Sequence, residues 1–161
     1  MDPLRIIEID LKNAEQRSIV LDLVCQFARA IMGDGQELSR DKQQALITGL
    51  EQHPTTLIFV ALYGERPAGI AITFLGFSTF AAQRLINIHD FYVVEAMRRQ
   101  GVGKALLVAI EEKATALNCC KLTLEVEEHN QRALSLYHRF GFDSGQYDSA
   151  AGTVLFRQKK L

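Results

Sequence analysis

A strand that runs directly into a glycine-opened helix is the feature that most constrains the fold of this chain. The stretch reads Asp90-Phe91-Tyr92-Val93-Val94-Glu95-Ala96-Met97-Arg98-Arg99-Gln100-Gly101-Val102-Gly103-Lys104. Strand-forming residues come first, and Gly101 and Gly103 then open the helix. The N–H groups of a first helical turn have no helical acceptors and lie at the positive end of the helix dipole. Such a turn suits a bound phosphate.

Glycine and basic side chains both fit this turn to a bulky phosphate group. Glycine lacks the Cβ that would keep a pyrophosphate away from the backbone. Arg98, Arg99 and Lys104 supply countercharge. The alternative explanation of the glycine pair is tight packing of the helix start, and the spacing alone leaves both explanations open.

Two well-known phosphate-binding motifs do not match this turn. A P-loop requires Gly-x-x-x-x-Gly-Lys-Ser/Thr, whereas Arg98 stands five residues before Gly103 and Ala105 follows Lys104. The dinucleotide fingerprint Gly-x-Gly-x-x-Gly fails because Leu106 occupies its third glycine position. The Walker A motif is therefore absent, and a nicotinamide enzyme is disfavoured.

The remaining secondary structure follows from apolar periodicity and from turn residues. We expect strands at 4–9, 56–63, 68–77, 85–94, 121–126, 142–147 and 153–158, and helices at about 19–32, 39–50, 102–117 and 130–140. The order β-α-α-β-β-β-α-β-α-β-β combines an antiparallel meander with a crossover. It predicts an α+β fold around one mixed, mostly antiparallel sheet of about seven strands with about four helices.

Length, composition and charge exclude several classes of protein. The 161 residues predict a single domain spanning 1–161, and a net charge of −1 disfavours nucleic-acid binding, which needs a cationic face. We find no secretory signal and no apolar run long enough for a membrane span, so we expect a cytoplasmic protein without a membrane partner. The three cysteines have no metal-ligand spacing, and we expect no metal site.

Two motifs together carry a resemblance to a known family. Arg98-x-x-Gly101-x-Gly103 resembles the acyl-CoA-binding signature of the GNAT N-acetyltransferase superfamily. A second signature of that family is similar to the downstream residues Asn130, Ala133, Leu136-Tyr137 and Gly141-Phe142. The strong resemblance spans about 86–142, whereas residues 1–80 match only in the order of their elements. In addition, the run from His89 to Val93 is similar to the polyamine acetyltransferase branch, which has a glutamate in place of His89.

The resemblance implies a GNAT-like fold with acetyl-CoA as cosubstrate. In that fold the main chain at Val93 and Val94 would pair with the pantetheine arm as an added strand would. Asn130 would cap the following helix and contact the cofactor; a helix cap alone is the alternative. The cofactor-binding residues implied are Val93, Val94, Arg98, Arg99, Gln100, Gly101, Val102, Gly103, Lys104 and Asn130.

Acetyl transfer from a thioester to an amine needs a proton acceptor and a proton donor. Tyr137 matches the family tyrosine that faces the cofactor sulfur, and we predict it as the general acid; a packed core tyrosine is the alternative. His89 is the predicted base, because imidazole changes charge near neutral pH. A purely structural histidine is the alternative. Period-two alternation predicts Asn87, His89 and Phe91 on one face of the strand and Asp90 on the other.

The acceptor is expected to be a small cationic amine that attacks the thioester directly in a ternary complex. Residues 1–51 carry six basic and nine acidic side chains, and Asp34, Glu37 and Asp90 are the predicted substrate carboxylates. The alternatives are a protein N-terminal or lysine acetyltransferase, a non-catalytic acyl-CoA-binding sensor on the same fold, and an unrelated anion-binding domain. The expected partners are the small-molecule amine and a second copy of the chain in a homodimer.

Overall fold

The structure is a computed structural model that describes residues 2–32, 37–143 and 157–160. The chain divides into two compact parts, residues 1–125 and residues 126–161, and each part is described here by itself. Within the described ranges, no helix combines the length and the apolar character that a membrane span requires.

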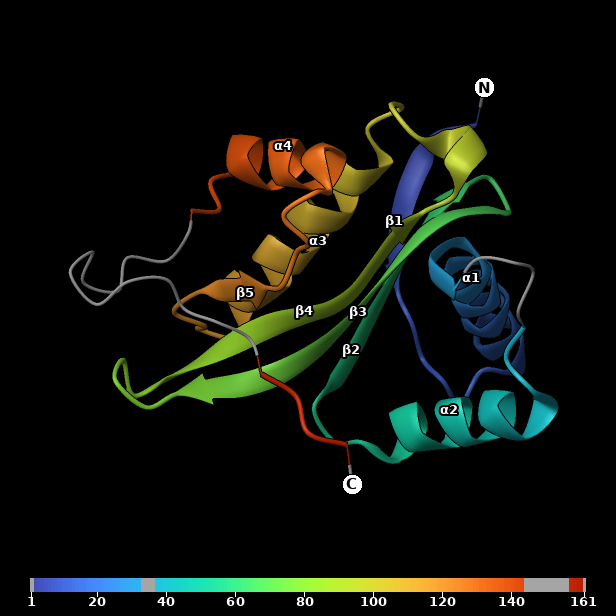
Figure 1. Cartoon of the computed structure of the whole chain (residues 1–161), viewed down its shortest axis with the longest axis horizontal. Helices are drawn as coiled ribbons and strands as arrows, with labels where there is room; N and C mark the ends of the chain where they lie inside the picture. The colour runs from blue at the N-terminus through green and yellow to red at the C-terminus, as the bar shows by residue number, and fades with distance from the viewer. Residues whose placement is uncertain (1, 33–36, 144–156, 161) are drawn as a thin grey trace. The chain divides into compact units, whose positions relative to one another are not determined.

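The secondary structure follows the predicted order as far as the last helix (Figure 1). The elements are β1 (Leu4–Glu8), α1 (Ala14–Met32), α2 (Arg40–Gln52), β2 (Thr56–Tyr63), β3 (Arg66–Ser78), β4 (Gln83–Val93), the 3₁₀ turn η1 (Glu95–Met97), α3 (Val102–Ala116), β5 (Leu122–Leu124) and α4 (Gln131–Phe140). The α+β fold with a mixed sheet and four helices is thus confirmed for the described residues.

The sheet has the strand order β1-β2-β3-β4-β5. The first four strands are antiparallel, and β5 joins β4 in parallel after the crossover through α3. The prediction of about seven strands is wrong for the described chain, whose sheet has five. The two further strands expected at 142–147 and 153–158 fall largely on residues 144–156, which lie outside the described residues.

Helices cover both faces of the sheet in the first part of the chain (Figure 1). α1 and α2 lie on one face, where Val20 and Leu23 of α1 and Ile47 of α2 pack against apolar strand residues such as Val60 and Ile72. α3 lies on the other face and contacts β1 to β4. Its inward stripe at i, i+4, i+8 is fully buried and consists of Val102, Leu106 and Ile110.

The start of α3 approaches the sheet closely at Gly69 of β3. A Cβ added to Gly69 would lie 2.8 Å from the carbonyl oxygen of Tyr92, 3.1 Å from Cγ1 of Val102 and 3.3 Å from Cδ1 of Leu106. Only a residue without a Cβ fits this space. Gly69 therefore fixes how closely the first turn of α3 lies against the end of β4.

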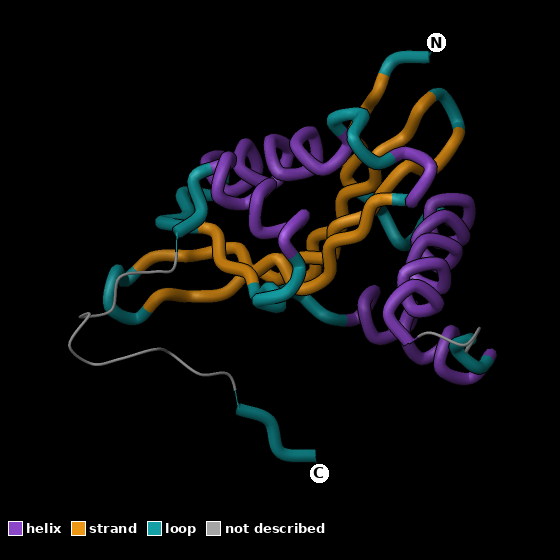
Figure 2. The backbone as a smooth tube through the Cα atoms, turned by 45° about the horizontal axis from the view of Figure 1, so that its top comes forward, coloured by secondary structure: helices purple, strands orange, loops and turns teal. Residues whose placement is uncertain are grey.

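β3 and β4 form the longest antiparallel pair of the sheet, and their hairpin continues past β2 (Figure 2). A β-bulge interrupts the pair, because Ile72 lies opposite Asp90 whereas Thr73 lies opposite Ile88. The extra residue is His89, which has no partner on β3. The side-chain alternation of β4 therefore shifts by one residue at His89.

The second part of the chain is described mainly by α4. Asn130 caps this helix, since its side-chain oxygen accepts from the N–H of Ala133 at 3.2 Å. Gly141 ends the helix in the left-handed conformation at φ +99°. Both ends of the predicted helix are thus explained by local cap chemistry.

Candidate active site

Several carbonyl groups of the turn between β4 and α3 are hydrogen-bonded within the protein. Four carbonyl groups accept a hydrogen bond from a neighbouring group of the first part of the chain. The pairs are Val94 O with Met97 N at 2.8 Å, Glu95 O with Arg98 N at 3.2 Å, Ala96 O with Gln100 Nε2 at 3.0 Å, and Gln100 O with Tyr63 Oη at 3.0 Å. These four acceptors are therefore already occupied within the fold.

The N–H groups of the same turn remain available. From Arg99 to Lys104, no main-chain N–H donates to a group in the described part of the chain. Arg99 and Gly101 adopt positive φ angles of 62° and 83°, and a Cβ added to Gly101 would meet nothing within 4 Å. Left-handed residues in such a turn produce a concave cluster of N–H groups that attracts anions. The predicted phosphate seat is thus built from main-chain donors beneath open space.

The three predicted countercharges differ in orientation. Arg98 is turned inward: its Nε donates to Val93 O at 3.2 Å, and its Nη1 lies 3.4 Å from Oε1 of Glu95. Arg99 and Lys104 are exposed, and neither pairs with a carboxylate of the described residues. Arg98 thus braces the turn, while Arg99 and Lys104 are the cations free to meet an anion.

Among the described residues, the edge of β4 is unpaired beyond the point where β5 ends. β5 pairs with β4 only at Ile86, Asn87 and Ile88. The N–H of Val94 donates to Ala68 O of β3 at 2.9 Å, so the alternating main-chain groups of Val93 point to the opposite, open side. Both main-chain groups of Val94 are already bonded within the fold, and Val93 N–H is the donor left facing outward.

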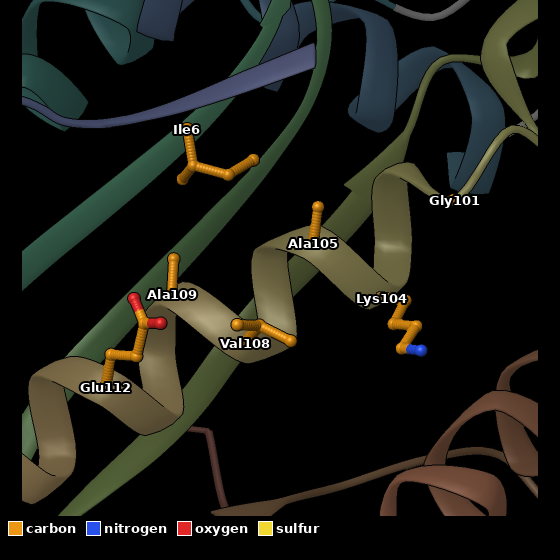
Figure 3. A pocket seen from close by; sticks show the side chains of 7 residues that line it. All are labelled: Ile6, Gly101, Lys104, Ala105, Val108, Ala109 and Glu112. Atoms are coloured by element: carbon orange, nitrogen blue, oxygen red, sulfur yellow. The ribbon is translucent and has the colours of Figure 1, made fainter.

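A hollow of about 410 Å³ runs along α3 beside the glycine turn (Figure 3). Gly101 and Lys104 line one end, and the apolar floor includes Ala105 and Ala109, which project toward Ile6 of β1. The hollow is therefore continuous with the predicted phosphate seat.

The bulge places the predicted base and its neighbours differently from the expected alternation. Asp90 lies opposite Ile72 and Asn87 lies opposite Phe74, and both partners belong to the apolar cluster under α1 and α2. Phe91 points to the opposite face, beside Ala71. The predicted grouping of Asn87 with Phe91, away from Asp90, is therefore wrong, because one extra residue in the strand reverses the alternation.

His89 is exposed and packs at the end of a short row of rings. Its imidazole lies 5.5 Å from the ring of Phe74 at 69°, and the ring of His53 lies 5.1 Å from Phe74 on an edge at 66°. His53 Nδ1 is 3.1 Å from Thr55 Oγ1, which orients that imidazole. Edge-to-face contacts of this kind are favourable, so Phe74 stabilises this position of the His89 ring.

Asp90 is a half-buried carboxyl beside that histidine. Burial raises the pKa of Asp90, and the charge of the neighbouring His89 opposes this shift as the smaller effect. Apart from His89, none of the described side chains pairs with Asp90. The site thus contains a carboxylate that the protein leaves largely uncompensated, which is the electrostatic requirement for holding a cation.

The remaining predicted acceptor carboxylates contribute less to this picture. Glu37 is exposed and lies 3.4 Å from Nε of Arg29, so a neighbouring cation already offsets its charge. Asp34 lies outside the described residues. No cluster of three or more potential metal ligands occurs among the residues that the structure describes. Burial raises the pKa of Cys119, which disfavours a thiolate nucleophile there.

Tyr137 and Asn130 belong to the second part of the chain. Tyr137 is buried, its ring lies 5.7 Å from that of Phe142, and burial raises its pKa to about 12. A phenol in this state keeps its proton at neutral pH and can donate it. Asn130 uses its side-chain oxygen as the helix cap. The structural alternatives stated for these residues, a packed core tyrosine for Tyr137 and a helix cap for Asn130, thus describe contacts that the structure contains.

Sequence reasoning missed two side chains that shape the site, Tyr63 and Phe74. Tyr63 contacts the glycine turn from 37 residues away, and Phe74 contacts His89 from the neighbouring strand. Strand alternation could have placed Phe74 on the face under α2. No local pattern connects Tyr63 with Gln100, because the two residues are 37 positions apart in the sequence.

Comparisons with known proteins identify a matching family and several similar proteins. The model of the family described as "Acetyltransferase (GNAT) family" matches residues 21–142. A thialysine N-epsilon-acetyltransferase of Caenorhabditis elegans is 24% identical over 140 residues, which are 85% of this chain and 81% of that protein. The spermine/spermidine N(1)-acetyltransferase of Bacillus subtilis (strain 168) is 33% identical over 70 residues, 42% of this chain and 46% of that protein. The structure of aminoglycoside N-acetyltransferase AAC(6')-Iy in complex with CoA has a similar fold, with a TM-score of 0.76 at 16% identity over 100% of this chain and 97% of that one.

Proposed function

The chain belongs to the GNAT acetyltransferase family, and we propose that it moves the acetyl group of acetyl-CoA to the amino group of a small cationic amine. That it is an acetyl-transfer enzyme follows from the family and from its relatives. The proposal adds the acceptor class, the site residues and direct attack in a ternary complex.

The observation that carries the proposal is the row of main-chain N–H groups from Arg99 to Lys104 that have no acceptor among the described residues, at the end of a strand edge that β5 leaves unpaired. The pyrophosphate of acetyl-CoA would bind these donors, with Gln100 to Gly103 forming the seat and Arg99 and Lys104 adding positive charge. The pantetheine arm would follow the open edge, where Val93 N–H faces outward. Val94 would support the cofactor site indirectly, because its main-chain N–H group holds the end of β4 in the sheet. Arg98 would support it by bracing the turn.

The proposed chemistry joins the amine nitrogen to the acetyl carbon and breaks the bond from that carbon to sulfur. His89 would take the proton that the ammonium group must lose before its nitrogen can attack. Tyr137 would give its proton to the departing thiolate, since its phenol is still protonated at neutral pH. Asn130 would contact the cofactor arm while it caps α4.

Asp90 supports a cationic acceptor. Its carboxyl lies beside His89 and lacks a basic side chain from the described residues to neutralise it. An ammonium group would supply that charge and would be concentrated next to the base. The relatives named for thialysine, spermine and spermidine are similar to this chain, and all three of these compounds carry amino groups. Glu37 and Asp34 would extend the same negative field at longer range.

A thiol-release assay with acetyl-CoA and a panel of acceptors tests the proposal. The panel includes diamines, polyamines, basic amino acids, an aminoglycoside, a neutral amine and peptides with a free N-terminus or lysine. We expect the diamines, polyamines or basic amino acids to give the highest kcat/KM. Preference for the peptides or for the neutral amine would contradict the acceptor class, and binding of acetyl-CoA without turnover of any amine would indicate a sensor instead.

A further inference from the structure

We propose that Tyr63 is a positioning residue for the pyrophosphate of acetyl-CoA, acting through the peptide bond between Gln100 and Gly101. The inference rests on the proposed seat of acetyl-CoA at the glycine turn. Tyr63 ends β2, and its hydroxyl donates to the carbonyl oxygen of Gln100 at 3.0 Å. This hydrogen bond joins a strand of the sheet to the carbonyl group directly before Gly101, the first glycine of the turn.

The geometry of the peptide bond lets this one hydrogen bond fix the direction of the Gly101 N–H group. In a trans peptide the C=O and the N–H point in opposite directions. Because Tyr63 holds the Gln100 carbonyl toward β2, the N–H of Gly101 must point away from β2 and out of the turn. Gly101 is at φ +83°, and glycine rotates between conformations more freely than any other residue. Without the hydroxyl, the Gln100 carbonyl would lose the hydrogen bond that orients this peptide.

Other carbonyl groups near the turn are held by residues other than Tyr63. Gln100 Nε2 holds the Ala96 carbonyl, and the inward guanidinium of Arg98 holds the Val93 carbonyl. On the helical side, the Gly101 carbonyl accepts from Ala105 N at 2.9 Å. Among the described residues, the Gln100 carbonyl has Tyr63 as its hydrogen-bond donor. A rotated peptide would present an oxygen to the pyrophosphate in place of a donor, so one contact would change from attractive to repulsive.

Tyr63→Phe tests the inference because it removes the hydroxyl and keeps the ring. Isothermal calorimetry and inhibition kinetics should compare CoA with two fragments: ADP, which carries a pyrophosphate, and pantetheine, which carries no phosphate. We expect the affinities of CoA and ADP to fall about three- to tenfold, the range set by the net worth of one hydrogen bond. Affinity for pantetheine and kcat at saturating acetyl-CoA should stay within about twofold of the wild type.

Thr73→Val is the matched control. Thr73 Oγ1 also donates to a carbonyl, that of Leu57 at 2.8 Å, but the bond lies inside the sheet. This variant should lose stability and keep its affinity for CoA and ADP. Equal CoA affinity in Tyr63→Phe and wild type, or equal losses for ADP and pantetheine, would overturn the inference. If Gly101→Asp also fails to weaken CoA, the seat itself is misplaced; if Gly101→Asp weakens CoA and Tyr63→Phe does not, the seat stands and only the role of Tyr63 falls.

Discussion

Replacing Gly69 with alanine tests how the start of α3 is positioned. The new Cβ would lie 2.8 Å from the Tyr92 carbonyl oxygen, and ordinary contact begins near 3.4 Å, so the atoms must separate by about 0.6 Å. The obstacle is backbone of β4, which cannot rotate away as the end of a side chain can. Overpacking of this kind costs about 1 to 3 kcal/mol of the free energy of unfolding. At about 2 to 4 °C per kcal/mol for a domain of this size, Tm should fall by about 2 to 12 °C.

Gly49→Ala is the matched control for this experiment. Gly49 lies in α2, where an added Cβ meets nothing within 4 Å. Alanine should therefore raise stability by about 0.5 to 1 kcal/mol, because glycine is the poorer helix residue. Urea denaturation followed by circular dichroism measures both variants.

The two variants should also differ in cofactor binding. Gly69→Ala pushes apart β4 and the first residue of α3, the two elements that carry the glycine turn, so affinity for acetyl-CoA should fall with stability. Gly49→Ala should leave that affinity unchanged. If Gly69→Ala is as stable as the wild type and binds acetyl-CoA equally well, the close approach at Gly69 does not position the turn.

Three further substitutions separate the proposed roles of the site residues. Tyr137→Phe should keep acetyl-CoA affinity and lower kcat by about 10²-fold or more. Since the pKa of Tyr137 is about 12, ionisation of this residue should cause no loss of wild-type activity below about pH 11. His89→Ala should remove the acid limb of the profile of kcat/KM against pH, because a protonated imidazole cannot accept the proton of the amine. Asp90→Asn should raise KM for a cationic amine and raise Tm at pH 7. The folded state holds the proton of Asp90 more tightly than the unfolded state, so the stability that protonation supplies is lost as pH rises through the folded pKa.

A specific result would contradict each of these three predictions. Turnover of Tyr137→Phe at the wild-type rate would leave Tyr137 as a packing residue. An unchanged acid limb in His89→Ala would eliminate His89 as the base. The Tm advantage of Asp90→Asn should vanish near about pH 3, where both states of the wild type are protonated, and an advantage that persists there would show that burial of the charge is not its cause.

The glycine turn and the order of the elements could be predicted from the sequence, because both depend on local chemistry. Gly101 and Gly103 mark a helix start, and Asn130 and Gly141 mark the ends of α4 by their own capping preferences. The face of Asp90 could not be predicted, because the bulge at His89 is a property of the pairing between β3 and β4.

Side-chain partners from distant segments were also beyond prediction. Arg98 is turned inward because Glu95 and the Val93 carbonyl compete successfully for its guanidinium. Tyr63 reaches Gln100 only once β2 and the turn are folded against each other. Basic residues near a phosphate turn predict a positive surface, but the contacts of the folded chain decide which of them face the ligand.

Calorimetric titration of acetyl-CoA into the wild type, Gly101→Asp and Gly103→Asp tests the central claim most directly. A carboxylate at either glycine would repel the pyrophosphate. A Cβ at Gly101 would meet nothing within 4 Å, and the strain of a side chain arises there from the φ angle of +83°. Asn118→Asp adds the same charge at an exposed position after α3 and serves as the control. We expect binding to be lost in both glycine variants and retained in the control. Equal affinity for acetyl-CoA in all four proteins would contradict the assignment of the glycine turn as the cofactor seat.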